Sequence, residues 1–118
     1  MPADARQAHA AWLACGGSCA SAWPDERFGL IIDGLFGIGI KRPIEGIYAH
    51  WLTAMQQCQA PVLAIDIPSG LDADTGSAWG AAVHASATVT FVGLKQGLFL
   101  GSAVDYVGAL EFADLGVP

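Results

Sequence analysis

PVLAIDIPSGLDADTG, residues 61–76, is the stretch from which the fold can be predicted. Its first part, Val62 to Ile65, is a short run of apolar and β-branched residues between turn formers, as is typical of a buried strand in a parallel sheet. The run ends at Asp66, and Pro68 and Gly70 follow. Ligands of such sheets bind just beyond the carboxyl ends of the strands, which is where Asp66 stands. Taken alone, the stretch fits a functional carboxylate or an ordinary acidic loop.

Periodicity and turn residues predict the other elements on either side of that strand. We expect helices over residues 2–15 and 46–58, strands over 28–33, 87–92 and 109–113, and a loop over 34–43. Residues 18–22 could add an edge strand, and residues 98–107 a loop or a short helix. The second helix should turn one apolar face to the core, formed by Ile47, Trp51, Leu52 and Met55. This order predicts an α/β fold with a mainly parallel sheet, and 118 residues allow one domain at most.

Composition excludes several classes of function. A net charge of −6 with only five Lys and Arg residues leaves no basic surface for nucleic acid or for acidic lipids. No apolar run reaches the roughly 18 residues of a spanning helix, and the start does not resemble a signal peptide, so we expect a cytoplasmic protein without a membrane partner. Cys15, Cys19 and Cys58 lack the spacing of a zinc site and are interpreted as small buried hydrophobic residues.

Two predicted strands end in a carboxylate, Asp33 and Asp66. If both strands lie in one parallel sheet, the two carboxylates emerge at the same edge, and the loop Gly37 to Pro43 lies over it. Glycines let backbone amides approach a pyrophosphate closely, and Lys41 and Arg42 can offset its charge. The complete GxGxxG pattern is absent, which argues against an ordinary dinucleotide-binding turn.

Three segments and the last six residues together resemble one family. They are DGLFGIGIKRP (residues 33–43), VLAIDIPSGLDADTG (62–76), TVTFVGLKQGLFLG (88–101) and the closing ADLGVP. They are similar to the second half of the NAD(P)H-hydrate epimerase domain. The resemblance implies a Rossmann-like three-layer sandwich and an isomerase that interconverts the R and S forms of NADHX or NADPHX, which are NADH and NADPH hydrated at nicotinamide C6. It also implies an ATP- or ADP-dependent dehydratase as partner, fused in a bifunctional enzyme or separate.

The same resemblance suggests site residues. It implies a potassium ion bound by Asp33 and Ser69, and substrate contacts from Asp66 and from Gly37, Ile38, Gly39, Ile40, Lys41, Arg42 and Pro43. Ile38 stands where many members have threonine, so a hydroxyl contact is lost there. Our hypothesis gives Asp66 the catalytic acid and base role. Asp72 and Asp74 are expected to order their loop, and Lys95 fits either a family position or a surface lysine.

Nothing in residues 1–28 matches the GxGNNGGD-type loop near the start of the family's domain. We therefore expect residues 1–118 to form a partial domain without its N-terminal part, inactive and poorly soluble on its own. A non-catalytic ligand-binding or scaffold module and a truncated remnant stay open as alternatives. The preference between NADHX and NADPHX, a dehydratase after Pro118 and a homo-oligomeric state are equally open.

Overall fold

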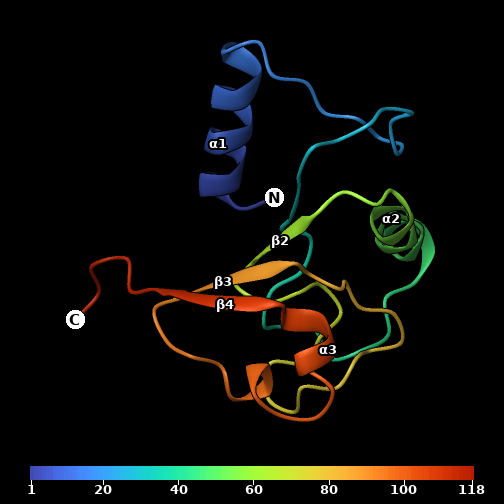
Figure 1. Cartoon of the computed structure of the whole chain (residues 1–118). Coiled ribbons are helices and arrows are strands. Elements are labelled where there is room, and N and C mark those ends of the chain that lie inside the picture. Colours follow the sequence, from blue (N-terminus) through green and yellow to red (C-terminus); the bar gives the residue numbers. More distant parts are fainter.

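A computed structural model describes all 118 residues and shows one four-stranded parallel sheet with strand order β1-β2-β3-β4 (Figure 1). The predicted α/β class with a parallel sheet is confirmed. In chain order the elements are α1 (Ala3–Ala14), β1 (Ile31–Asp33), α2 (Gly46–Gln57), β2 (Val62–Ile65), β3 (Ala87–Phe91), the 3-10 helix η1 (Gln96–Leu98), α3 (Val104–Val107) and β4 (Ala109–Ala113).

The register of the sheet places the carboxyl ends of the strands together. Asp33, the last residue of β1, pairs with Ala64 in β2, and Ile65, the last residue of β2, pairs with Val89 in β3. β3 is rich in β-branched residues, which pack well on a pleated surface. Its buried Thr88 donates its hydroxyl to the carbonyl oxygen of Val107 at 2.7 Å, so this polar group is satisfied inside the core.

Two separate hydrophobic clusters hold the elements on the sheet. One consists of Ile44, Leu52, Met55, Val62 and Val83, and the other of Ile67, Leu71, Ala73, Leu98, Ala103 and Val107. α2 therefore docks through Leu52 and Met55, as predicted, with Trp51 half-buried beside them. Ile47 was assigned to the same face and is 51% exposed. At 3.6 residues per turn it lies about 140° around the helix from Leu52, outside the contact face.

The first thirty residues contribute little to this core. α1 runs between Pro2 and Gly16, as predicted, but buries no residue and stands apart from the sheet in Figure 1. The suggested edge strand over residues 18–22 is wrong, because that backbone pairs with no strand and β1 is the edge of the sheet. No helix of the chain is long and apolar enough to cross a membrane.

The interpretation of the cysteines as buried is also wrong. Cys15 and Cys19 are exposed and Cys58 is half-buried, and all three are free thiols. Cys15 follows the last residue of α1, a helix that buries no residue, and Cys58 follows the last residue of α2, where the helix leaves the core.

The acidic loop after β2 contacts the segment around η1 through close backbone approaches as well as through side chains. The amide of Gly97 donates to the carbonyl oxygen of Ala73 at 2.6 Å. A Cβ added to Gly97 would lie 2.3 Å from the carbonyl oxygen of Asp72, and one added to Gly76 would lie 2.0 Å from that of Leu100. Gly76 also has a φ of +71°, a conformation that favours glycine. These glycines fix the loop over the carboxyl edge of the sheet.

Candidate functional site

Asp33 and Asp66 lie at the same edge of the sheet, as predicted. Asp33 ends β1 and Asp66 directly follows β2, and these two strands are parallel neighbours. Their side chains nevertheless contact different partners, so that two polar groups form at this edge rather than one.

Asp33 and Ser69 form the first group, and the structure brings them together as predicted. The Ser69 hydroxyl donates to Asp33 Oδ1 at 2.6 Å, and the Ser69 amide donates to Oδ2 at 2.8 Å. Each residue is only 1% exposed. The amide of Phe36 donates to Ser69 Oγ at 3.0 Å, and the Phe36 carbonyl oxygen lies 3.4 Å from the same atom. This oxygen-only set of carboxylate, hydroxyl and carbonyl groups fits a hard cation such as potassium by its chemistry.

Asp66 and Lys95 form the second group, which is linked to β3. The Lys95 ammonium donates to Asp66 Oδ1, and the amide of Phe91 donates to the same oxygen at 3.1 Å. The Thr90 hydroxyl donates to it as well, at 3.2 Å. Burial of Asp66 opposes its ionisation, but these donors, Lys95 foremost, outweigh it and hold the pKa of Asp66 below its ordinary value. Asp66 is therefore a carboxylate at neutral pH.

The backbone at Asp66 has an unusual conformation. Its φ is +72°, and the amide of Ile67 donates to the carbonyl oxygen of Ile65 at 2.9 Å, which closes a three-residue turn. β3 ends in the same way, with Val92 at a φ of +66° inside a turn from Phe91 to Gly93. Side chains other than glycine rarely adopt this region, and such strain concentrates at functional sites.

The loop over residues 37–43 lines a surface pocket of about 660 Å³. Five of the pocket's residues are apolar, and its lining includes Gly37, Gly39, Ile40, Lys41, Arg42, Pro43, Phe36 and Tyr48. A Cβ on Gly37 or Gly39 would meet no atom within 4 Å, so their backbone faces open space. Ile38 is exposed and lies outside this lining. Asp33, Ser69 and Asp66 do not line this pocket. Phe36 lines it and also donates its amide to Ser69 Oγ, so Phe36 links the pocket to the Asp33–Ser69 group.

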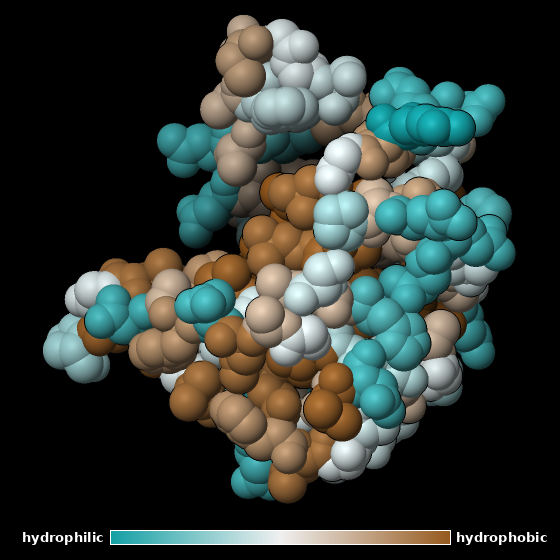
Figure 2. Space-filling view, in the orientation of Figure 1, coloured by the Kyte–Doolittle hydropathy of each residue, from teal (hydrophilic) through white to brown (hydrophobic).

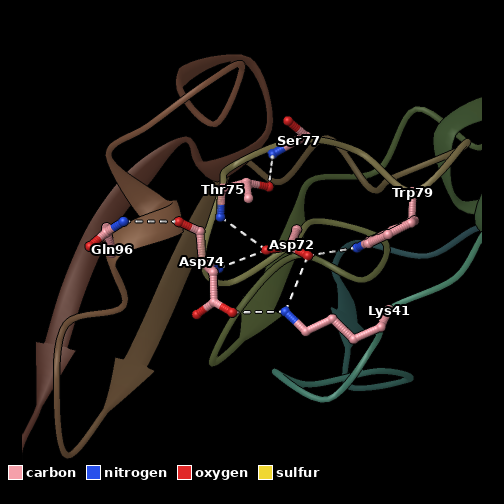
Figure 3. Close-up of polar contacts among 7 residues, drawn as sticks. All are labelled: Lys41, Asp72, Asp74, Thr75, Ser77, Trp79 and Gln96. Carbon is pink, nitrogen blue, oxygen red and sulfur yellow. Dashed lines mark hydrogen bonds and ion pairs between the residues drawn. The ribbon is translucent and has the colours of Figure 1, made fainter.

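Lys41 is already engaged by the acidic loop, as Figure 3 shows. Its ammonium lies 2.8 Å from Asp74 Oδ2 and 3.3 Å from Asp72 Oδ2, and the hydrogen bond to Asp74 is the main cause that raises the Lys41 pKa. Arg42 forms no ion pair, so it is the free cation of the pocket.

Asp72 organises its own loop, in line with the expected role. Its Oδ1 accepts the amides of Asp74 and Thr75 at 2.8 and 2.9 Å, and its Oδ2 accepts Trp79 Nε1 at 2.9 Å (Figure 3). The two amides are the main cause that holds the pKa of Asp72 far below its ordinary value.

Lys95 and Thr90 are the site residues whose role the sequence did not settle. Thr90 is a buried polar residue at the end of β3, and Lys95 follows it by five residues across a loop. The threonine near the end of a strand, followed by a lysine, was the only sequence signal for this pair. The turn at Val92, which brings Lys95 back to Asp66, has no sequence signature.

The fold and the two polar groups at the carboxyl edge of the sheet define a parallel-sheet α/β protein with a carboxylate site at its strand ends. The family model described as "YjeF-related protein N-terminus" matches residues 1–97, and the chain belongs to this family.

Curated relatives agree with the predicted resemblance. The chain is 42% identical over 119 residues to the "Bifunctional NAD(P)H-hydrate repair enzyme Nnr" of Vibrio cholerae, covering 99% of this chain and 24% of the relative. It is 43% identical over 119 residues to the "NAD(P)H-hydrate epimerase" of Achromobacter xylosoxidans, covering 99% and 57%. It is 48% identical over 85 residues to the enzyme of that name in Limosilactobacillus fermentum, covering 72% and 41%. The chain thus spans only part of the length of these relatives.

Proposed function

We propose that the protein to which these residues belong epimerises hydrated NAD(P)H at nicotinamide C6. The observation that carries this proposal is Asp66: an ionised, partly exposed carboxylate at the carboxyl end of β2, in a chain 42–43% identical over 99% of its length to relatives with epimerase or repair-enzyme names. Several relatives are named bifunctional NAD(P)H-hydrate repair enzymes, and we infer that a dehydratase is the second activity and acts on the epimerised hydrate.

The chemistry of the substrate defines what the site must do. C6 of the hydrate carries a hydroxyl group and is bonded to the ring nitrogen. The nitrogen lone pair can expel that hydroxyl group, which leaves with the C–O electron pair and takes up a proton to become water. The planar iminium that remains can accept water from either face, and this water then loses a proton. Removal and return together change only the configuration at C6.

An ionised Asp66 suits two of these steps. Its charge stabilises the iminium cation, and it accepts the proton of the returning water. Because its pKa is lowered, the protonated form that donates to the departing oxygen is scarce at neutral pH. Asp66 therefore rests as the base and electrostatic partner. In the hypothesised acid and base role, its protonated minority donates the proton to the departing oxygen, and the proton lost by the returning water restores that protonated form.

The pocket formed by the loop over residues 37–43 is proposed to hold the dinucleotide. Open backbone at Gly37 and Gly39 can approach a pyrophosphate closely, and Arg42 adds a cation with no partner of its own. Asp33 and Ser69 would hold a potassium ion through their oxygens, and the ion would supply positive charge near the bound phosphates. Either NADHX or NADPHX fits these features.

The experiment compares wild type with Asp66→Asn in the complete gene product. Asn keeps the size of the side chain and tolerates a positive φ. A mixture of R and S hydrates is supplied with a dehydratase specific for one epimer, and consumption of the other epimer is followed in potassium chloride and in choline chloride. We expect Asp66→Asn to lower the rate by at least about 100-fold. Asp105→Asn, at an exposed aspartate without a side-chain partner, is the matched control.

Near-normal turnover by Asp66→Asn would refute its role. Binding of the hydrate without any turnover by the wild type would favour the ligand-binding alternative instead. Equal rates in the two salts would refute the potassium site.

A further inference from the structure

We propose that Lys95 is a positioning residue for Asp66: it holds carboxylate oxygen Oδ1, so that Oδ2 is the oxygen that exchanges the proton with substrate. This inference rests on the proposed function and deepens it, because it divides the work of one carboxylate between its two oxygens.

All the hydrogen bonds that Asp66 accepts through its side chain end on Oδ1. Lys95, Thr90 and the amide of Phe91 donate to this oxygen, and no group of the chain donates to Oδ2. The one buried side-chain polar atom without a partner is Nε1 of Trp51, so the unpartnered Oδ2 is reached by solvent. The carboxylate, 25% exposed, therefore presents one bound and one free oxygen.

Lys95 has no hydrogen left for a ligand. An ammonium group carries three hydrogens, and Lys95 donates to Asp66, to Thr90 Oγ1 at 2.9 Å and to the Phe91 carbonyl oxygen at 2.8 Å. Its side chain is 17% exposed. Lys95 can therefore act on the reaction through Asp66, which distinguishes a positioning residue from a catalytic one.

The backbone also restrains the position of Asp66. The turn around Asp66 fixes its φ at +72°, and the amide of Asp66 donates to the carbonyl oxygen of Val89 at 2.7 Å. Asp66 is thereby tied to β3 by main chain and side chain. Lys95 is its one ion-pair partner in the chain.

The test measures the pH dependence of epimerisation and the titration of the Asp66 carboxyl carbon by NMR in the same complete protein. Lys95→Met keeps an unbranched side chain that is one atom shorter, and it removes the charge and the hydrogen-bond donors. We expect it to lower kcat at least tenfold while KM changes less than threefold, and to move the Asp66 pKa upward. Lys95→Arg should restore most of both values, because it keeps a donor and a charge.

Two further variants make the test specific. Arg27→Met removes an exposed positive charge elsewhere and should change neither kcat nor the Asp66 titration. Thr90→Val keeps the volume of a buried side chain and removes one donor to Oδ1, so a smaller change in the same direction is expected. If Lys95→Met does not fold, Thr90→Val serves as the test variant in its place.

The outcomes separate the two claims. If the wild type epimerises and Lys95→Met and Thr90→Val leave kcat and the Asp66 titration unchanged, the positioning role is wrong and the proposed function stands. If the wild type does not epimerise the hydrates, the proposed function is wrong and this inference falls with it. A rise in KM alone would place Lys95 in substrate binding and also overturn the proposal.

Discussion

At the scale of single residues, the site depends on carboxylates that the surrounding chain keeps ionised. Asp66 and Asp72 share this property for different reasons. A lysine ammonium is the chief donor to Asp66, whereas backbone amides of its own loop are the chief donors to Asp72. The first arrangement leaves an oxygen free for a ligand, and the second uses the carboxylate to hold a loop in shape.

Asp72 predicts how stability depends on pH. Its folded pKa lies below the unfolded value of about 4, so the stability that it contributes is complete above pH 4 and is lost as the pH falls through the folded pKa. Asp66 contributes in the same direction. We expect the urea midpoint of unfolding to fall between pH 5 and pH 3, and Asp72→Asn to be less stable than wild type at pH 7.

The difference between these two proteins should shrink towards pH 3, because Asp72 of the unfolded wild type then takes up a proton that the folded state does not. Asp105→Asn, measured in parallel, should follow the wild type at every pH, because Asp105 has no side-chain partner. An equal difference between wild type and Asp72→Asn at pH 7 and pH 3 would contradict the assigned cause.

At the scale of elements, α2 shows how one face of a helix is chosen. Leu52 is buried in the cluster beside β2, and Ile47 points to solvent although both residues are equally apolar. We expect Leu52→Ala to lower the free energy of unfolding by about 2–5 kcal/mol, since it leaves a cavity. Ile47→Ala should change it by less than about 0.5 kcal/mol, as is usual at exposed positions. Urea titration of both variants checks this, and equal effects would show that the assigned face is wrong.

Most elements could be predicted from sequence because their signals are local. The run before Asp66 and the β-branched residues of β3 gave strands close to their observed bounds, and the glycines after residue 33 gave a loop. Residues 18–22 were misassigned because an edge strand needs a neighbour, which a local pattern cannot supply. The pairing of Asp66 with Lys95 depends on two turns with a positive φ at Asp66 and Val92, and residues other than glycine give no warning of such turns.

The sequence predicted residues of the candidate site, but it did not predict all the contacts that these residues make. Asp33 and Ser69 were paired on the family resemblance, and the structure shows them in contact. Lys41 was expected to face a phosphate, and the structure shows it bound to Asp72 and Asp74. Ion pairs between loops depend on how those loops cross in space, which spacing along the chain does not reveal.

At the scale of the whole molecule, exposed apolar surface and net charge have opposite effects on self-association. Figure 2 shows apolar side chains gathered around β4, α3 and η1, where Phe99, Val104 and Phe112 are exposed. β1 and β4 are edge strands with unpaired backbone groups. The net charge of −6 repels copies of the chain from one another, but salt screens it within about 10 Å at 0.1 M.

We therefore expect the 118-residue chain to self-associate as its concentration rises. Phe112→Lys places a charge on β4, where Phe112 is 50% exposed, and should shift sedimentation towards the monomer. Leu13→Lys makes the same kind of change on α1, away from the sheet, and serves as the control. A single sedimenting species at all concentrations would contradict this expectation.

The glycines that join the acidic loop to the η1 segment restrict which substitutions this part of the protein can accept in evolution. Gly76 and Gly97 meet main-chain oxygens of Leu100 and Asp72, with no side chain in between. When two side chains collide, shortening one of them can relieve the collision, but a carbonyl oxygen cannot be shortened. A substitution at either glycine should therefore lack a compensating mutation nearby, and directed evolution starting from Gly76→Ala should recover by reversion.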